Sequence, residues 1–422
     1  MSWKFLVLLL ILVLAEFYSF LIMRSAVRKF PRAAAMATMA LYVVMTVFLE
    51  GGMFFFRKID WTQYPTILRN VYIALSFGLV VGKVLVVVLL LLNDLRRIGI
   101  WVYNKIVPKK DEIDERTGDL MPRSVFIMRA ALITAGVSLG GFIYGMGNRY
   151  KYIVRRVRIT SPKVPPAFKG LKIVQISDIH TGSFDNHEAV ASGIQRILDL
   201  KPDVIFFTGD LVNDRTIEVD SQYKEIYSRL KAPLGVYSTL GNHDYGDYAQ
   251  WPNLEAKAKN LQDIIQLHAD MGWRLLMDEH VLLERGGDSI GVIGVQNIPG
   301  AGVRGMNGPF HMYGDMAKAY TGIETKNAPF KILLSHDPSH WDAEVIEKYK
   351  DVDLTLSGHT HGMQFGVELP WMKWSPIQYM YKNWAGLYTE NNQHLYVNRG
   401  FGFLGYPGRL GIMPEITLIE LA

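Results

Sequence analysis

The chain opens with long apolar runs and then changes to a different pattern. Four segments, at about 3–23, 34–56, 72–92 and 125–146, consist mostly of apolar residues. Each is long enough to cross a bilayer as a helix, which takes about 20 residues. The first run is too long for a secretory signal and lacks a small-residue cleavage site. We therefore predict a transmembrane region of four helices over residues 1–148.

After residue 148, short apolar segments alternate with Gly, Pro, Asn and Asp, as in α/β domains. Residues 150–160 predict a strand within a connecting segment, 149–170. Further strands are predicted at 171–176, 204–208, 235–240, 290–295, 331–334, 354–356, 395–397 and 415–420, and helices at 187–200, 223–230, 254–271 and 341–349. Residues 171–422 are therefore expected to form one layered α/β or α+β sandwich.

Polar residues follow five of these strands, at the point where each strand ends. The blocks are Ser177-Asp178-Ile179-His180, Gly209-Asp210, Gly241-Asn242-His243-Asp244, Ser335-His336-Asp337 and Gly358-His359-Thr360-His361. Loops at the carboxyl ends of strands in α/β sheets converge on one site. Carboxylate, amide and imidazole groups together suit divalent ions such as Mn, Fe or Zn. Because one aspartate can bridge two ions about 3.5–4 Å apart, the pattern favours a two-metal centre.

Composition narrows the chemistry further. The chain has no cysteine, which excludes disulfides, thiolate metal sites and cysteine nucleophiles. The net charge of +5 is mild, and the basic residues lie beside the apolar runs. No basic patch interleaves with aromatic residues, so we expect no nucleic-acid partner.

The five blocks resemble, in order, the D-x-H, GD, GNH[DE], H and GHxH pattern of the calcineurin-like metallophosphoesterase superfamily. The resemblance extends from about residue 172 to 397. The apolar runs that precede it are similar to those of transmembrane proteins with a metallophosphoesterase domain. The resemblance implies a sandwich of two β-sheets flanked by helices, and an enzyme that hydrolyses a phosphoric ester or anhydride with two divalent metal ions.

The resemblance also assigns roles to individual residues. The implied metal ligands are Asp178, His180 and His361 for the first ion, Asn242, His336 and His359 for the second, and Asp210 as a bridge between them. His243 would lie near the leaving oxygen, as an acid or as a stabiliser of phosphoryl charge. From its place next in the chain, we expect Asp244 to orient His243.

A stretch beside the last block, residues 362–388, is rich in Trp, Tyr and Met and poor in charge. Core packing is the usual role of such residues, but two prolines and the lack of periodicity favour a loop. We favour an apolar wall, including Trp371 and Trp374, that touches the bilayer surface or the acyl chains of a substrate. Arg399 and Arg409 are candidates to clamp a phosphate.

Basic residues in the connections predict the orientation in the membrane. They are Arg24, Arg28, Lys29 and Arg32 in the first connection, Arg57, Lys58 and Arg69 in the second, and Arg96, Arg97, Lys105, Lys109, Lys110, Arg116 and Arg123 in the third. The more basic side is cytoplasmic. We therefore expect the first and third connections inside, and both termini and the catalytic domain on the extracytoplasmic, periplasmic side. Arg149, Lys151, Arg155, Arg156 and Arg158, after the last span, oppose this orientation.

Four charged residues, Glu16, Glu50, Lys83 and Arg129, fall within or at the ends of the apolar runs. Charges there are costly and are usually paired or functional. Snorkelling at helix ends, or Glu–Lys pairing inside the bundle, is our main interpretation. A polar groove for a lipid headgroup is the alternative.

The leading functional hypothesis is hydrolysis of a phosphodiester or pyrophosphate bond of a lipid-linked substrate at the bilayer. A phosphodiesterase acting on soluble nucleotides or cell-wall polymers is the alternative enzyme. A metal-binding scaffold or sensor without activity is the alternative of another class, and the complete ligand set argues against it. The sequence does not indicate the oligomeric state.

Overall fold

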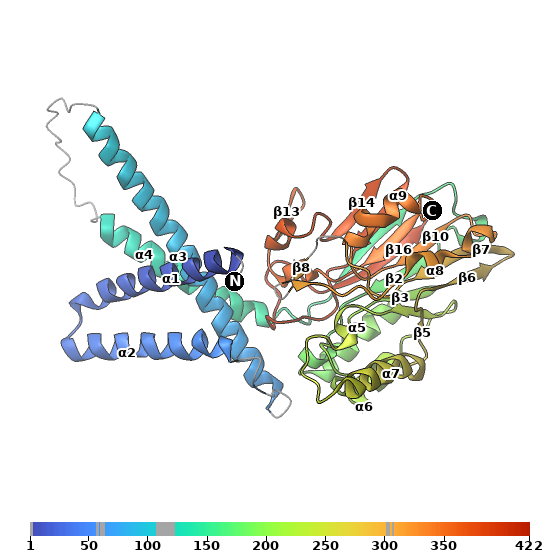
Figure 1. Cartoon of the computed structure of the whole chain (residues 1–422), viewed down its shortest axis with the longest axis horizontal. Helices are drawn as coiled ribbons and strands as arrows, with labels where there is room; N and C mark the ends of the chain where they lie inside the picture. Colours follow the sequence, from blue (N-terminus) through green and yellow to red (C-terminus); the bar gives the residue numbers. More distant parts are fainter. Residues whose placement is uncertain (1–2, 56–58, 60–63, 107–122, 301–303, 306–307) are drawn as a thin grey trace. The chain divides into compact units, whose positions relative to one another are not determined.

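A computed structural model describes residues 3–55, 59, 64–106, 123–300, 304–305 and 308–422 (Figure 1). These residues form two compact units, Met1–Gly145 and Met146–Ala422. Phe56, which ends the second predicted span, and the basic residues Arg57, Lys58, Lys109, Lys110 and Arg116 lie outside the described residues.

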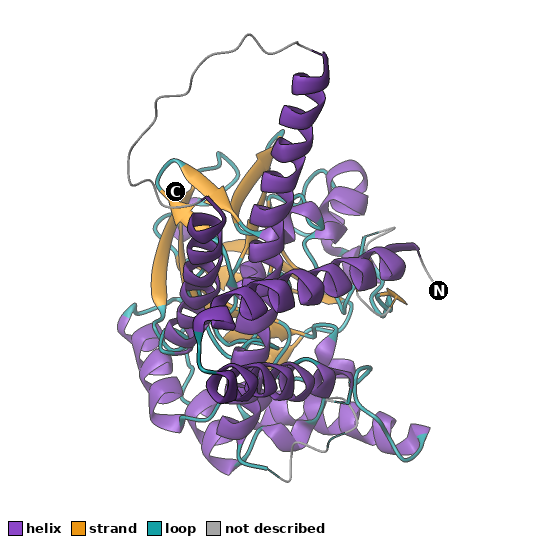
Figure 2. Cartoon of the chain, turned by 90° about the vertical axis from the view of Figure 1, so that its left-hand side faces the viewer, coloured by secondary structure: helices purple, strands orange, loops and turns teal. Residues whose placement is uncertain are grey.

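The first unit is helical (Figure 2). Its helices are α1 (Trp3–Ala26), α2 (Arg32–Leu49), α3 (Thr66–Ile106) and α4 (Arg123–Met146), with short turns η1 (Val27–Lys29) and η2 (Gly51–Phe54). Each helix overlaps one predicted span, and α3 continues at both ends because no proline interrupts its 41 residues. Among the described residues, three helical segments are long and apolar enough to cross a membrane: Arg32–Met53, Thr66–Ile106 and Arg129–Met146.

An ionic cluster around the buried Lys83 joins three of these helices. The ammonium group of Lys83 lies 2.5 Å from a carboxylate oxygen of Glu16 and 2.6 Å from one of Glu50. It also donates to the Thr46 hydroxyl at 3.0 Å, and the Tyr42 hydroxyl donates to Glu16 at 3.2 Å. The structure confirms Glu–Lys pairing inside the bundle.

Replacing Lys83 with methionine should destabilise the first unit by about 3–5 kcal/mol, because it leaves two carboxylates without their cation in an apolar region. The triple variant Lys83→Met, Glu16→Gln, Glu50→Gln should recover most of this loss. Thermal unfolding of the full chain in detergent measures both. If the Lys83→Met variant were as stable as the triple variant, the ionic cluster would not be what holds the helices together.

The second unit contains two six-stranded sheets (Figure 1). In spatial order the first sheet is β1 (Ile153–Ile159), β16 (Glu415–Leu421), β2 (Lys172–Ile176), β3 (Val204–Thr208), β4 (Val236–Thr239) and β5 (Arg274–Leu275). The second is β14 (Gly386–Glu390), β15 (Gln393–Val397), β11 (Leu354–Ser357), β10 (Lys331–Leu334), β7 (Asp288–Gly294) and β6 (Glu279–Arg285). Strands β2 to β5 are mutually parallel, and so are β7, β10, β11 and β15.

Helices and hairpins complete this unit. The helices are α5 (His187–Asp199), α6 (Ser221–Ser228), α7 (Leu254–Asp270), α8 (Met316–Tyr320) and α9 (Ile346–Lys348), which follows a π-helical turn, η10 (Trp341–Val345). The two-stranded hairpins are β8 (Arg304–Gly305) with β9 (Gly308–Pro309), and β12 (Val367–Leu369) with β13 (Met372–Trp374).

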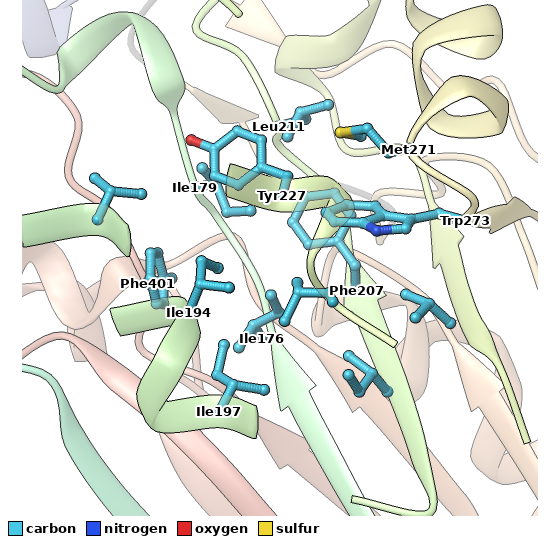
Figure 3. Packing of buried hydrophobic residues seen from close by; sticks show 14 of the residues in the cluster. Ile176, Ile179, Ile194, Ile197, Phe207, Leu211, Tyr227, Met271, Trp273 and Phe401 are labelled. Carbon is cyan, nitrogen blue, oxygen red and sulfur yellow. The ribbon is translucent and has the colours of Figure 1, made fainter. Parts of the chain in front are cut away.

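Strand β3 shows how the layers form. All five of its residues are buried. Ile205 and Phe207 pack in a cluster with side chains of α5, α6 and α7 (Figure 3), whereas Val204 and Phe206 pack against strands of the second sheet. A strand covered on both faces becomes a continuous apolar run. The predicted sandwich of two sheets flanked by helices is confirmed.

The sequence prediction lacked β6 and β14 of the second sheet, and it differs from the structure again in residues 362–388. This stretch was expected to be a loop, but it contains the β12–β13 hairpin and a single helical turn, η12 (Pro376–Tyr379). Its strands have three residues each, too few to produce a recognisable alternation.

Candidate metal centre

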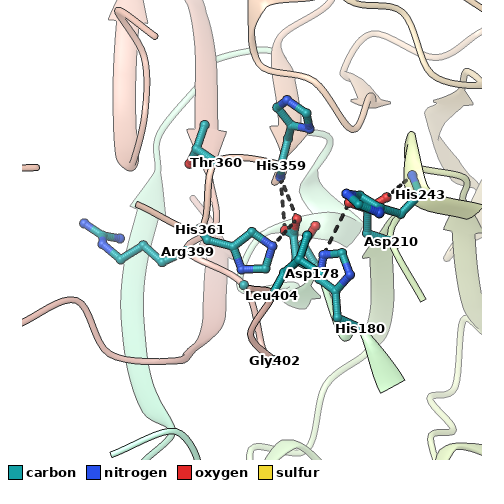
Figure 4. Close-up of polar contacts among 12 residues, drawn as sticks. Asp178, His180, Asp210, His243, His359, Thr360, His361, Arg399, Gly402 and Leu404 are labelled. Atoms are coloured by element: carbon teal, nitrogen blue, oxygen red, sulfur yellow. Dashed lines mark hydrogen bonds and ion pairs between the residues drawn. The ribbon is translucent and has the colours of Figure 1, made fainter. Parts of the chain in front are cut away.

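The five polar blocks meet at one edge of the sandwich because they follow parallel strands. Strands β2, β3 and β4 are neighbours in the first sheet, and β10 and β11 are neighbours in the second. The loops also bind one another. The Asp178 amide donates to the Gly209 carbonyl at 2.8 Å. The His359 amide donates to the Asp178 carboxylate at 2.9 Å (Figure 4).

The first group of donors consists of Asp178, His180 and His361. One ligand atom from each lies within 4.8 Å of the others, and all three residues are buried. His361 Nε2 is 3.3 Å from Asp178 Oδ1. Asp210 adjoins this group, because its Oδ2 lies 3.4 Å from His180 Nε2.

The second group consists of Asp210, His336 and His359, again with one atom from each within 4.8 Å of the others. The same Oδ2 of Asp210 lies 3.1 Å from His336 Nε2, so this carboxylate adjoins both groups. Asn242 Oδ1 is 2.8 Å from His359 Nδ1. The Asn242 amide nitrogen donates to the Tyr248 hydroxyl at 2.9 Å, which turns the amide oxygen toward His359.

The donor atoms of both groups fit cations. Both ring nitrogens of His180 and Nε2 of His361 are buried and have no hydrogen-bond partner among the described residues. His336 Nδ1 lies 2.7 Å from the Thr208 carbonyl. A carbonyl only accepts, so Nδ1 carries the hydrogen, and Nε2 directs a lone pair at Asp210 whenever the ring is neutral. Facing acceptors of this kind need a positive charge between them, and imidazole with carboxylate suits divalent transition ions.

Charge within the centre also favours a cation. Burial opposes protonation of His336, but the carboxylates of Asp210 and Asp178 raise its pKa to about 10. A proton on His336 and a divalent ion compete for the same carboxylates, because an imidazole must be deprotonated to bind metal.

The backbone of the centre is strained. Ten non-glycine residues of the described chain have a positive φ, and five of them are predicted ligands: Asp178, His180, Asp210, His359 and His361. The left-handed conformation is unfavourable for residues with a side chain, at about 1–3 kcal/mol each. Loops that persist in it are held by surrounding contacts, which preorganises the ligands.

Gly241 allows the loop after β4 to approach Asp210. A Cβ at position 241 would lie against the Asp210 carboxylate and 2.7 Å from the Asp210 amide nitrogen. Gly241→Ala should therefore displace the carboxylate and lower the hydrolytic activity that the sequence predicts by about 100-fold, as expected for a misplacement of about 1 Å. Gly136→Ala is the matched control, because a Cβ there meets nothing within 4 Å. Phosphodiester hydrolysis by the purified variants tests this, and equal rates would contradict it.

His243 is held by a backbone carbonyl. Its Nδ1 lies 2.6 Å from the carbonyl oxygen of Asn213, so Nδ1 carries the hydrogen and Nε2 is left for another partner. Its ring centroid is 4.9 Å from that of His180. Burial lowers the pKa of His243 to about 4.

Asp244 does not orient His243 as expected. Its carboxylate accepts instead from the amides of Asp210, Leu211 and Gly241, at 2.8–2.9 Å. These bonds tie the loop after β3 to the loop after β4. The physical reason is that, in the tight turn η8 (His243–Tyr245), three backbone amides occupy the Asp244 carboxylate, whereas His243 Nδ1 lies against the Asn213 carbonyl.

Tyr381 is a further residue of the centre that we did not predict. Its hydroxyl is 2.7 Å from Nε2 of His359, on the side of the ring away from Nδ1. A partner on the outer nitrogen of a ligating imidazole fixes the ring orientation, and its loss typically lowers metal affinity about 10–100-fold. Tyr381→Phe should lower Mn²⁺ affinity by that factor in a metal titration, whereas the exposed Tyr379→Phe should leave it unchanged. Equal affinities of the two variants would contradict this positioning role.

The two arginines expected to clamp a phosphate have other partners. Arg399 is buried and binds Glu415 at 2.6 Å and Glu368 at 2.7 Å. Arg409 is fully buried and donates to the carbonyls of His361, at 3.1 Å, and Arg399, at 2.7 Å. These contacts support the loops that carry the centre, so we assign neither arginine to the substrate.

The two tryptophans expected near the substrate lie on the β12–β13 hairpin. Trp371 is at its turn and is 80% exposed. Trp374 is half-buried in β13, where its indole nitrogen lies 3.5 Å from the Tyr379 hydroxyl.

Comparison with known proteins places this arrangement in a family. Residues 171–363 match the family model described as "Calcineurin-like phosphoesterase", and residues 1–148 match the one described as "Probable Calcineurin-like phosphoesterase, transmembrane domain". YkuE, an uncharacterized metallophosphoesterase of Bacillus subtilis, is 31% identical over 303 residues, covering 70% of this chain and 93% of that protein. The chain belongs to the calcineurin-like phosphoesterases.

Two further relatives of this calcineurin-like phosphoesterase carry more informative names. A Danio rerio protein named transmembrane protein with metallophosphoesterase domain is 31% identical over 300 residues, or 69% of this chain and 62% of that protein. The UDP-2,3-diacylglucosamine pyrophosphatase LpxG of Chlamydia trachomatis is 26% identical over 317 residues, or 63% of this chain and 88% of that protein.

Members of this family are phosphoester hydrolases that use divalent metal ions. The protein is therefore a membrane-associated, metal-dependent phosphoester hydrolase, and the predicted family, fold and enzyme class are confirmed.

Proposed function

We propose that the protein uses two divalent ions (Mn, Fe or Zn) to hydrolyse a phosphodiester or pyrophosphate bond of a lipid-linked substrate on the extracytoplasmic side of a membrane. The observation that carries the dinuclear assignment is the position of Asp210, whose Oδ2 lies within 3.4 Å of His180 Nε2 in one donor group and 3.1 Å of His336 Nε2 in the other. A single carboxylate that adjoins both groups is the arrangement a two-metal hydrolase requires.

The assignment of ligands follows the two groups. Asp178, His180 and His361 would hold one ion and Asn242, His336 and His359 the other, with Asp210 shared between them. Ions bound there would supply positive charge to the phosphoryl oxygens and make water acidic enough to react near neutral pH.

Among the side chains of the protein, His243 has the most clearly defined role in the proposed hydrolysis. The carbonyl of Asn213 fixes its Nδ1, so Nε2 is the atom available to the substrate. Because the imidazole of His243 is neutral at pH 7 in the metal-free protein, it can accept a proton from the reacting water. Once protonated, it can return that proton to the leaving oxygen.

Two observations support a lipid-linked substrate. The catalytic unit shares its chain with helices of membrane-spanning length, which raises its effective concentration toward anything in the same bilayer. The relative LpxG is named for a pyrophosphatase activity on UDP-2,3-diacylglucosamine, a diacylated compound.

Hydrolysis assays with the full chain in Mn²⁺ test this proposal. A diacylated sugar nucleotide in mixed micelles should be cleaved with a higher kcat/KM than bis-p-nitrophenyl phosphate or cyclic nucleotides. Preference for soluble nucleotides, or for wall polymers, would replace the lipid-linked substrate with the alternative phosphodiesterase activity. No turnover of any phosphoester would favour a metal-binding scaffold.

The side of the membrane has its own test. An alkaline phosphatase fused after Ala422 should be active in bacterial cells, because this reporter folds only outside the cytoplasm. If the alkaline phosphatase fusion is inactive and a separate C-terminal fusion of green fluorescent protein is fluorescent, the catalytic site lies on the cytoplasmic side.

A further inference from the structure

The second unit concentrates its exposed apolar side chains in one segment. Among its described residues, twelve large apolar side chains are exposed, and eight of them lie between residues 363 and 387. Six of the eight define what we call the hairpin patch: Met363, Leu369, Trp371, Met372, Tyr379 and Met380. A cluster of this kind on a soluble surface marks a site for a partner or a membrane.

Contacts within the segment show that the patch is one surface. Leu369 faces Met372 across the β12–β13 pair. The Trp374 indole nitrogen lies 3.5 Å from the Tyr379 hydroxyl, which joins the hairpin to the turn η12. The Ser375 hydroxyl donates at 2.8 Å to the carbonyl of Gly362, the neighbour of Met363.

The hairpin patch adjoins the metal centre at two points. Met363 is two residues after His361, in the same turn, η11 (His361–Gln364). Met380 precedes Tyr381, whose hydroxyl is 2.7 Å from the His359 ring. Met380 and Tyr381 help to line a pocket of about 270 Å³, together with Ser339, Asp342, Lys382 and Asn383. The hairpin patch thus continues into a pocket beside the centre whose wall includes the charged side chains Asp342 and Lys382.

We propose that the hairpin patch docks on the surface of the bilayer, so that a lipid's phosphate group reaches the metal centre while its chains stay in the membrane. This inference rests on the proposed function and names the surface that serves it. The bilayer is the favoured occupant because the same chain carries helices of spanning length. The exposed Trp371 and Tyr379, 80% and 78% accessible, are also the residue types that favour the membrane–water interface.

The absence of cysteine from the chain allows a direct test. Single variants Met372→Cys and Tyr379→Cys, in the full chain reconstituted into phosphatidylcholine vesicles, are labelled with an environment-sensitive fluorophore. The controls are Ile217→Cys and Leu254→Cys, which are 81% and 85% exposed but lie outside the patch. The readout is fluorescence quenching by lipids that carry a nitroxide on the acyl chain.

Docking predicts blue-shifted emission and strong quenching at positions 372 and 379, and neither effect at positions 217 and 254. Equal quenching at all four positions would overturn the proposal. Protection of positions 372 and 379 without lipid quenching, together with cross-linking between chains, would also overturn it, because the patch would then cover a second copy.

Turnover separates this inference from the proposed function. The triple variant Trp371→Ser, Met372→Ser, Tyr379→Ser should hydrolyse bis-p-nitrophenyl phosphate at the wild-type rate. Its kcat/KM for a diacylated pyrophosphate substrate in vesicles should fall about tenfold or more. An unchanged rate on the vesicle substrate overturns docking but not the lipid substrate. Lipid quenching of the labelled Met372→Cys and Tyr379→Cys variants, together with a wild-type protein that does not cleave the vesicle substrate, would instead overturn the proposed function.

Discussion

The Asp210→Asn variant should hydrolyse phosphodiesters about 1000-fold more slowly than the wild type, a loss of about 4 kcal/mol of transition-state stabilisation. Asparagine keeps the shape of the side chain but removes its charge and one of its two acceptor oxygens. One oxygen of Asp210 accepts from the His243 amide at 2.9 Å, and the other adjoins both donor groups. The measurement is kcat/KM for bis-p-nitrophenyl phosphate with saturating Mn²⁺.

Asp353→Asn is the control for this prediction. Asp353 is also a buried aspartate, but it binds Lys163 and the Lys331 amide, away from the metal centre. Its variant should keep most of the wild-type activity per folded molecule. An Asp210→Asn enzyme within tenfold of the wild type would mean that this carboxylate is not shared between metals.

The His243→Asn variant should lose about 100- to 10,000-fold in kcat, the usual contribution of a group that transfers a proton in the transition state. Its metal content should stay at the wild-type level, because His243 belongs to neither donor group. Steady-state kinetics and elemental analysis of the same preparation measure the two quantities. His187→Asn, at an exposed histidine that binds Asp220, is the matched control and should be fully active.

A parallel loss of metal and activity in His243→Asn would contradict the role assigned to this residue. It would then be a ligand, or a support for one, rather than a group that contacts the substrate. A rate within tenfold of the wild type would instead exclude proton transfer by His243 as a major contribution.

The sequence predicted the layers of the second unit because its central strands, such as β3, are apolar throughout and are bounded by polar loops. It also predicted the candidate centre, since each donor residue stands at a strand end and sheet topology brings these ends together. The structure brings six of the seven predicted ligands into two adjoining groups and places the seventh, Asn242, beside His359.

The sequence did not predict several contacts of the centre, because the groups that make them are not marked by any pattern of residue types. The Asn213 group that holds His243 is a backbone carbonyl, which every residue possesses. Tyr381 reaches His359 from the loop that follows η12, 22 positions along the chain, with no spacing rule to indicate it. The pairing of Arg399 with Glu415 joins two residues whose contact no spacing along the chain predicts.

The metal content of the purified full-length chain tests the central claim most directly. After loading with Mn²⁺ and removal of unbound metal, elemental analysis should give about two ions per chain, as a dinuclear hydrolase requires. The Asp210→Asn variant should retain one ion or fewer. A fully active wild-type enzyme with one ion per chain, or with none, would contradict the account.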